Sequence, residues 1–233
     1  MADEKRVAIL QSNYIPWKGY FDMIAAVDEF ILYDDVQFTK NDWRNRNKIK
    51  TPKGLEWISV PVGQDINRRI RDVQLVSASW QLKHWRTLEA NYRRTTYFDE
   101  VAAILEPMYT QQTYSHLSEL NRAFIIVICG YLGIQTKISN SWDYAVKDGK
   151  TERLVDLCEQ VGAQVYISGP AAQCYIDEEQ FRDKGIRLEW FDYSGYMEYP
   201  QLWGTFVHNV TVLDVLFNCG KSSKNYMKYV SKP

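Results

Sequence analysis

The chain has 233 residues, of which 45% are hydrophobic and 24% charged, as is ordinary for a soluble globular protein. Its formal net charge of −1 at pH 7 excludes an overall attraction to nucleic acid or to an anionic membrane. No apolar run reaches the ~20 residues of a spanning helix, and the first residues lack a secretory signal. We therefore expect a cytoplasmic protein without membrane insertion, whose four scattered cysteines are reduced and mostly buried.

The first part of the chain alternates between strand and helix patterns. Arg6–Gln11 and residues 29–35 (EFILYDD) are short apolar runs that end in polar residues, which predicts two buried strands. Gly19–Val27 between them has helical periodicity. Strand, short helix and strand predict the start of a parallel βαβ arrangement, and Glu56–Val62 predicts a further strand.

The middle of the chain changes to helical patterns, whereas strands and helices alternate again after it. The predicted middle helices are Trp80–Arg94, Tyr97–Tyr109 and Ser115–Leu132. Beyond them we expect strands at 136–139, 164–168 and 186–191, and helices at 150–161, 176–184 and 209–218. The pattern predicts an α/β fold, a Rossmann-like, mainly parallel sheet with a helical insert. Residues 1–79 and 134–233 would form the core and residues 80–133 the insert.

Three predicted strand ends carry polar residues, where parallel sheets bind ligands. These polar stretches begin at Gln11, at Asp34-Asp35 and at Ser168. Gln11 and Ser168 are therefore candidate substrate contacts, and Asp34 or Asp35 could act as general base. Only one of the two carboxylates would face a pocket, because adjacent side chains on a strand point opposite ways. As a turn cap, the Asp-Asp pair needs no function.

Aromatic residues gather where the first strand hands over to the first helix. Tyr14, Trp17 and Tyr20 lie in the stretch YIPWKGY, and aromatic faces suit a sugar or a nucleobase. Gly19 allows close backbone approach there, and the helix that starts beside it attracts phosphate. At least one of the three rings must pack in the core, so the stretch predicts a pocket with fewer than three aromatic contacts.

The segment 40–50, KNDWRNRNKIK, is a short basic stretch with interleaved polar and aromatic residues. Arginine can clamp a diphosphate with paired hydrogen bonds, and asparagine amides can read hydroxyls. A solvated basic edge strand is the alternative. One tryptophan falls short of a stacking platform for RNA, so we expect no nucleic-acid partner. The candidate substrate contacts in and beside the segment are Gln37, Lys40, Trp43, Arg44, Asn45 and Arg46.

His208 directly precedes the last predicted helix and Asn209 begins it, at a place where anions and general bases are often found. His208 is therefore a catalytic candidate and Asn209 a substrate-binding candidate. The three histidines have no metal-ligand spacing, so no metal site is predicted.

The stretches QSNYIPWKGYFDMI, YISGPAAQCYIDEEQF and YPQLWGTFVHNVTVLDVLFNCG closely resemble the WbqC-like protein family. This resemblance implies a bacterial cytoplasmic protein associated with biosynthesis of O-antigen, the polysaccharide of lipopolysaccharide, or of another surface polysaccharide. A weaker resemblance links the strand, turn and helix around Lys18 to the nucleotidylyltransferase and pantothenate-synthetase-like superfamily. Its HxGH motif, which acts on ATP phosphates, corresponds to WKGY here, so aromatics replace both histidines. Lys18 or the arginines of the basic segment would have to substitute for them.

Together these features predict transfer of an acyl or aminoacyl group to the amine of a nucleotide-linked amino sugar. Asp34, Asp35 or His208 would take the proton. ATP and Mg²⁺ are needed if the acyl donor is made on the enzyme, but not if it arrives preactivated. Two alternatives stay open: a non-catalytic module that binds a glycan or nucleotide sugar, and a glycosyltransferase. The aromatic content is compatible with a homodimer.

Overall fold

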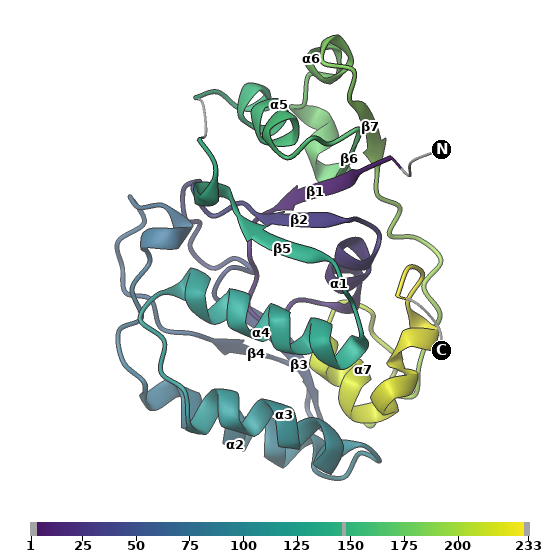
Figure 1. The fold of residues 1–233 in the computed structure, drawn as a ribbon. Coiled ribbons are helices and arrows are strands. Elements are labelled where there is room, and N and C mark those ends of the chain that lie inside the picture. Colours follow the sequence, from purple (N-terminus) through teal and green to yellow (C-terminus); the bar gives the residue numbers. More distant parts are fainter. Residues whose placement is uncertain (1–3, 146–147, 231–233) are drawn as a thin grey trace.

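A computed structural model describes residues 4–145 and 148–230 and confirms the α/β fold with a mainly parallel sheet (Figure 1). Five strands pair in the order β5-β2-β1-β6-β7, and every pairing is parallel. The strands are β1 (Arg6–Leu10), β2 (Glu29–Leu32), β5 (Lys137–Asn140), β6 (Val165–Ser168) and β7 (Arg187–Trp190). The predicted βαβ start is also confirmed, since β1 and β2 are parallel neighbours on either side of one helix.

Helices cover both faces of this sheet, because successive strand side chains point to opposite faces. Ala8 and Phe30 face the larger core, whereas Val7 and Ile31 face the smaller one. The larger core includes α1 (Lys18–Ala25), α4 (Leu117–Leu132) and α7 (Val212–Cys219). The smaller core packs under α5 (Thr151–Gln160) and α6 (Glu178–Asp183), which Figure 1 shows on the opposite side of the sheet.

A second sheet lies apart from the parallel one and was not predicted as a unit. It is the antiparallel hairpin of β3 (Arg46–Thr51) and β4 (Gly54–Ser59). The predicted strand Glu56–Val62 overlaps β4, and half of the basic segment, for which an edge strand was the alternative interpretation, is strand β3. The alternation was hidden because buried Asn47 supplies a polar residue to the inner face. Helices α2 (Ser79–Tyr92) and α3 (Phe98–Thr110) lie beyond the hairpin (Figure 1).

Helix α7 has a capping residue at each end. The Thr211 hydroxyl caps it by accepting a hydrogen bond from the backbone N–H of Leu213 at 3.3 Å. Gly220 ends it with a φ of +53°, and a Cβ there would overlap with the ring of Tyr97.

All four cysteines are unpaired, and Cys129, Cys158 and Cys219 are buried, as expected for reduced thiols. Within the part of the chain that the structure describes, no helix has the length and apolar character needed to cross a bilayer.

The order of the strands creates a switch point in the parallel sheet. From β1 the chain continues to β2 on one side, and it later adds β6 on the other side of β1. The connections therefore leave the carboxyl ends of β1 and β6 in opposite directions, which opens a crevice between them.

Candidate ligand-binding site

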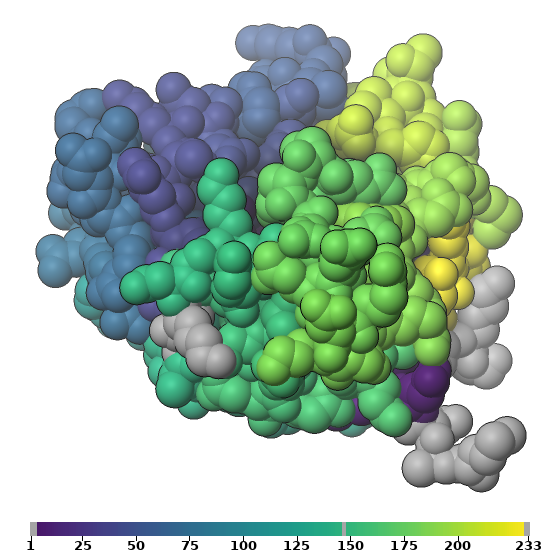
Figure 2. All heavy atoms as spheres, turned by 90° about the horizontal axis from the view of Figure 1, so that it is seen from above, coloured from purple at the N-terminus to yellow at the C-terminus, as the bar shows by residue number. Residues whose placement is uncertain are grey.

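A cavity of about 580 Å³ lies at this crevice, and we call it the switch-point cavity. Its walls come from the ends of β1, β2 and β6, from the residue before α5 and from the first turn of α5. Figure 2, which looks onto the α5–α6 side, shows the purple-to-blue N-terminal residues beside the green ones of the second half. The lining residues are Ile9, Leu10, Gln11, Tyr33, Val36, Arg44, Gly149, Lys150, Arg153, Leu154, Tyr166, Ser168, Gly169, Ala171, Ala172 and Tyr175.

Three cations line the switch-point cavity, and no Asp or Glu is among its described lining residues. Lys150 precedes α5 and Arg153 lies in its first turn, with the guanidinium carbon 5.5 Å from the ring centre of Tyr33. The helix N-terminus adds a partial positive charge at this place. The cavity is therefore suited to a ligand that carries negative charge.

Arg44, the third cation, is largely withdrawn from water. Its side chain is 12% exposed, and burial lowers the pKa of its guanidinium. Its Nη1 donates to Oδ1 of Asn13, and its Nη2 lies 3.6 Å from the Asp42 carboxylate. The Nε atom is buried without a hydrogen-bond partner among the described residues. An anion in the cavity would compensate this desolvated charge.

A second cavity of about 280 Å³, the aromatic cavity, is lined by Asn13, Pro16, Trp17, Trp43, Asn47 and Asn209. Trp17 packs against Tyr193 and Tyr196, with ring centres 5.3 and 5.6 Å away. The hydrogen bond between Arg44 and Asn13 joins a residue of the switch-point cavity to a residue of the aromatic cavity. The walls of the two cavities are therefore joined by a direct hydrogen bond.

The loop between β1 and α1 is held rigidly between these cavities. Ile15 has a φ of +38°, which a β-branched residue adopts only when its surroundings enforce it. Asn47 donates to the carbonyls of Tyr14 and Ile15 at 3.0 and 2.9 Å, and the Thr211 hydroxyl donates to Ile15 at 2.7 Å. Because distant segments fix this backbone, the positions of Asn13 and Trp17 are set before any ligand binds.

Asp34 supports the same loop from inside the protein. Its carboxylate has no exposed surface and accepts hydrogen bonds from the Ser12 backbone N–H at 2.8 Å and the Ser118 hydroxyl at 2.6 Å. Burial raises the pKa of this carboxyl. Asn121 extends the network by donating to the Ser12 hydroxyl at 3.0 Å and to the Arg44 carbonyl at 2.9 Å.

Six predicted site residues lie on cavity walls. Gln11, Arg44 and Ser168 line the switch-point cavity, and Trp17, Trp43 and Asn209 line the aromatic cavity.

Four predicted contacts lie in the interior instead. Tyr14 is fully buried, and its hydroxyl lies 2.9 Å from Nδ1 of His84; Tyr20 donates to the Gln11 carbonyl at 3.1 Å. Asn45 donates to the Val60 carbonyl at 2.9 Å, and buried Lys18 donates to the Met197 carbonyl at 3.0 Å. These side chains line neither cavity: the turn that presents Trp17 directs Tyr14, Lys18 and Tyr20 into the interior, and Asn45 bonds to the residue directly after β4.

Three others line neither cavity. Gln37 is exposed, Lys40 donates to Oε1 of Gln64 at 2.8 Å, and Arg46 covers the indole of Trp57. The cations of the basic segment are not gathered into one clamp, because β3 turns alternate side chains to opposite faces and, of the segment's Lys and Arg residues, only Arg44 lines one of the two cavities.

The remaining catalytic candidates differ in their surroundings. Asp35 pairs with Nη1 of Arg71 at 2.9 Å and accepts from the Ser141 hydroxyl at 2.7 Å. His208 is half-buried beside Phe206 and directly precedes Asn209 of the aromatic cavity. Burial and, after it, the charge of Lys18 lower the pKa of His208.

Four wall residues of the switch-point cavity were not predicted from the sequence: Tyr33, Lys150, Arg153 and Tyr175. A usable signal was present, since Lys150 and Arg153 stand three residues apart at the start of a predicted helix. In the described ranges 4–145 and 148–230, no group of three or more His, Cys, Asp or Glu side chains could hold a metal ion.

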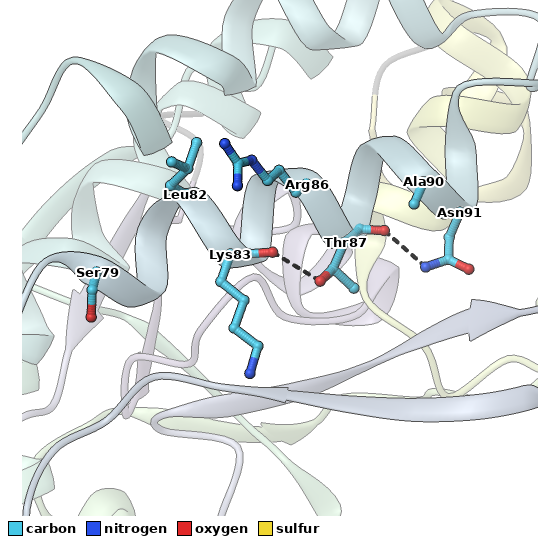
Figure 3. Close-up of a pocket in the computed structure, with 7 residues that line it drawn as sticks. All are labelled: Ser79, Leu82, Lys83, Arg86, Thr87, Ala90 and Asn91. Carbon is cyan, nitrogen blue, oxygen red and sulfur yellow. Dashed lines mark hydrogen bonds between the residues drawn. The ribbon is translucent and has the colours of Figure 1, made fainter.

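A third cavity, of about 420 Å³, runs along α2 and is built differently (Figure 3). All its lining residues belong to that helix. Thr87 and Asn91 donate to the helix's own carbonyls at Lys83 and Thr87, both at 2.8 Å. It lacks convergent groups from several elements, so we assign it no ligand.

The fold places the chain among α/β proteins with a Rossmann-like parallel sheet. The chain belongs to the WbqC-like protein family, whose model matches residues 11–226. It is 53% identical over 227 residues to the Mycobacterium tuberculosis protein named Uncharacterized protein Rv1507c, covering 97% of this chain and 98% of that relative. The search of solved structures finds no match.

Proposed function

We propose that this protein transfers an acyl or aminoacyl group to the amine of a nucleotide-linked amino sugar, in the biosynthesis of a bacterial surface polysaccharide such as O-antigen. The observation that carries this proposal is the connected pair of cavities, one cationic and one aromatic, at the carboxyl ends of the parallel strands. A nucleotide sugar has a flat base, a diphosphate and a sugar ring, and therefore needs both kinds of wall.

The nucleoside diphosphate would occupy the switch-point cavity. Lys150, Arg153 and Arg44 supply positive charge for the phosphates, and the N-terminus of α5 adds backbone donors. Tyr33 and Tyr175 offer aromatic surface for the base.

The sugar would occupy the aromatic cavity, on the far side of the hydrogen bond between Arg44 and Asn13. Trp17 and Trp43 present indole surface to the ring, and exposed Asn209 can bond to sugar hydroxyls.

Amide formation requires a group that takes the amine proton as the nitrogen attacks the acyl carbonyl. Of the three predicted candidates, His208 has the best placement, because it directly precedes Asn209, a wall residue of the aromatic cavity. Its lowered pKa favours the neutral imidazole at pH 7, and its Nδ1 is buried without a hydrogen-bond partner among the described residues. Asp34 has no exposed surface, and Asp35 is paired with Arg71.

The Lys150→Ala/Arg153→Ala double variant tests the diphosphate site. We expect it to weaken binding of nucleotide sugars about tenfold or more, since hydrogen bonds to charged groups contribute ~1.5–3 kcal/mol each. Calorimetric titration with UDP-, dTDP-, GDP- and CMP-sugars measures the affinities. Lys83→Ala/Arg86→Ala is the matched control, because it removes the same pair at the same spacing from the α2 cavity. Equal binding by both variants, or no binding by the wild type, would contradict the proposal.

The Gly19→Ala variant tests the sugar site. A Cβ at residue 19 would overlap with the Trp17 indole and force it into or out of the aromatic cavity. We expect the affinity for the preferred nucleotide sugar to fall, while that for the free nucleoside diphosphate stays. Gly130→Ala in α4 is the control, since nothing lies within 4 Å of its added Cβ. Equal loss of both affinities would place the sugar elsewhere.

One observation favours a second function, a non-catalytic nucleotide-sugar-binding module. Among the described residues that line the two cavities, none is Asp, Glu, His or Cys. A module of this kind would bind a nucleotide sugar without changing it. Mass spectrometry of the sugar after incubation with acyl donors distinguishes the two, because only the enzyme forms an amide.

A further inference from the structure

Two tryptophans in tilted contact, with an interplanar angle of 42°, lie beside two cations at the outer side of the β3–β4 hairpin: Trp57 in β4, Trp43 just before β3, and Arg46 and Lys48 in β3; we call these four residues the indole platform. The ring centres of Trp43 and Trp57 are 5.2 Å apart. The guanidinium carbon of Arg46 lies 4.2 Å from the Trp57 ring centre, and Nζ of Lys48 lies 4.9 Å from it. Nevertheless Trp43 is 38% exposed and Trp57 42% exposed.

The hairpin does not need these indoles for its own packing. Trp57 lies opposite Lys48 in the strand register, and the intervening residues Ile49 and Ile58 turn to the other face, where both are buried. The platform is thus the solvent side of the hairpin. Two large aromatic side chains held together there, with cations beside them, suit recognition of a flat ring attached to anionic groups.

The platform also continues the aromatic cavity, because Trp43 belongs to both. A molecule on Trp57 would therefore reach past Trp43 to a ligand in that cavity. The indoles can stack on a nucleobase, and Arg46 and Lys48 can pair with phosphates. The net charge of −1 disfavours a long polyanion such as RNA.

We propose that the indole platform binds the second substrate, an acyl donor that carries a nucleobase linked to phosphates. This inference rests on the proposed acyl transfer. The donor is either a coenzyme A thioester or an acyl adenylate. The sugar nitrogen attacks the acyl carbon and a C–N bond forms. The C–S bond of the thioester, or the C–O bond to phosphate, breaks and its electron pair leaves with the sulfur or oxygen. The amine proton passes to the base.

Titration of the full-length wild type and the Trp57→Ala variant with coenzyme A and with ATP tests this assignment. We expect one of the two probes to bind the wild type and the variant to bind it about tenfold or more weakly, since base stacking on one aromatic contributes ~1–3 kcal/mol. Binding of the nucleotide sugar should stay unchanged. Trp142→Ala is the matched control, because Trp142 also lies beside an arginine, at 5.5 Å, but lines neither cavity.

Each outcome of these titrations either supports or overturns the proposed donor site. A coenzyme A signal lost in Trp57→Ala identifies a thioester donor. An ATP signal lost there identifies an adenylate donor, formed when a carboxylate oxygen attacks the α-phosphorus of ATP and the P–O bond to the departing pyrophosphate breaks. Binding of neither probe, or equal binding by wild type and variant, overturns the donor site. If Trp57→Ala also loses binding of the nucleotide sugar, Trp57 belongs to the sugar site, and the proposed donor site is overturned. If nucleotide sugars bind nowhere but a probe still needs Trp57, the proposed function fails while the platform stands. Arg46→Ala/Lys48→Ala repeats the test if Trp57→Ala does not fold.

Discussion

Replacing Asp34 by alanine should lower the free energy of unfolding by about 3 kcal/mol and also weaken nucleotide-sugar binding. Its buried carboxylate accepts from the Ser12 N–H and the Ser118 hydroxyl, and both donors would be left unsatisfied at ~1–3 kcal/mol each. Ser12 also bonds to Asn121, which holds the Arg44 carbonyl, so the loss should reach the switch-point cavity. Urea unfolding and calorimetric titration measure the two effects.

Two further variants separate positioning from catalysis at Asp34. In Asp34→Asn the amide oxygen can accept from Ser12 and the amide nitrogen can donate to Ser118, so stability and turnover should largely return. Asp35→Ala, the neighbouring change, loses a partly exposed ion pair with Arg71 and leaves one buried donor, the Ser141 hydroxyl, where Asp34→Ala leaves two, so it should cost less stability. An Asp34→Asn protein that is as stable as wild type but has no turnover would identify Asp34 as the general base instead.

Acidification should destabilise the protein through His84 by about 3 kcal/mol in total, of which about 2 kcal/mol is lost between pH 7 and pH 5. His84 is buried against Tyr14, and burial lowers the pKa of its imidazole from 6.5 to about 4. Between these two values the unfolded chain binds the proton and the folded protein does not. The contribution is therefore present above pH 6.5 and is lost as the pH falls toward 4.

Urea unfolding at a series of pH values measures how the free energy of unfolding changes with pH. The His84→Gln variant has no imidazole at this position and should lose this part of the pH dependence, even if it is less stable at pH 7. A slope that is identical in the variant would show that other groups carry the acid sensitivity.

The order of elements could be read from the sequence because it depends on local patterns. Short apolar runs that end in polar residues located β1, β2 and β6. The β3–β4 hairpin could not be predicted as a unit from such patterns. Its inner face carries Asn47, whose amide holds the β1–α1 loop, so a structural polar residue broke the alternation that identifies a strand.

The candidate site could be predicted only in part, for a related reason. Strand ends and aromatic residues indicated Gln11, Ser168, Trp17 and Trp43 as wall residues, because the carboxyl edge of a parallel sheet is polar and open by construction. Residue type could not show that Tyr14 turns inward to His84 while Trp17 stays at a cavity. That choice depends on the strained backbone at Ile15, which segments far away in the chain enforce.

The sequence by itself determined the class of the fold, part of the walls of the two cavities, and membership of the WbqC-like family, because strand periodicity and continuous motifs are local. Only the tertiary structure decided which charged side chains line the switch-point cavity. Lys150 and Arg153 join Arg44 across more than 100 residues of chain, because the parallel sheet places β1 beside β6 and brings the start of α5 over their ends. Such a meeting depends on long-range pairing, which no local pattern encodes.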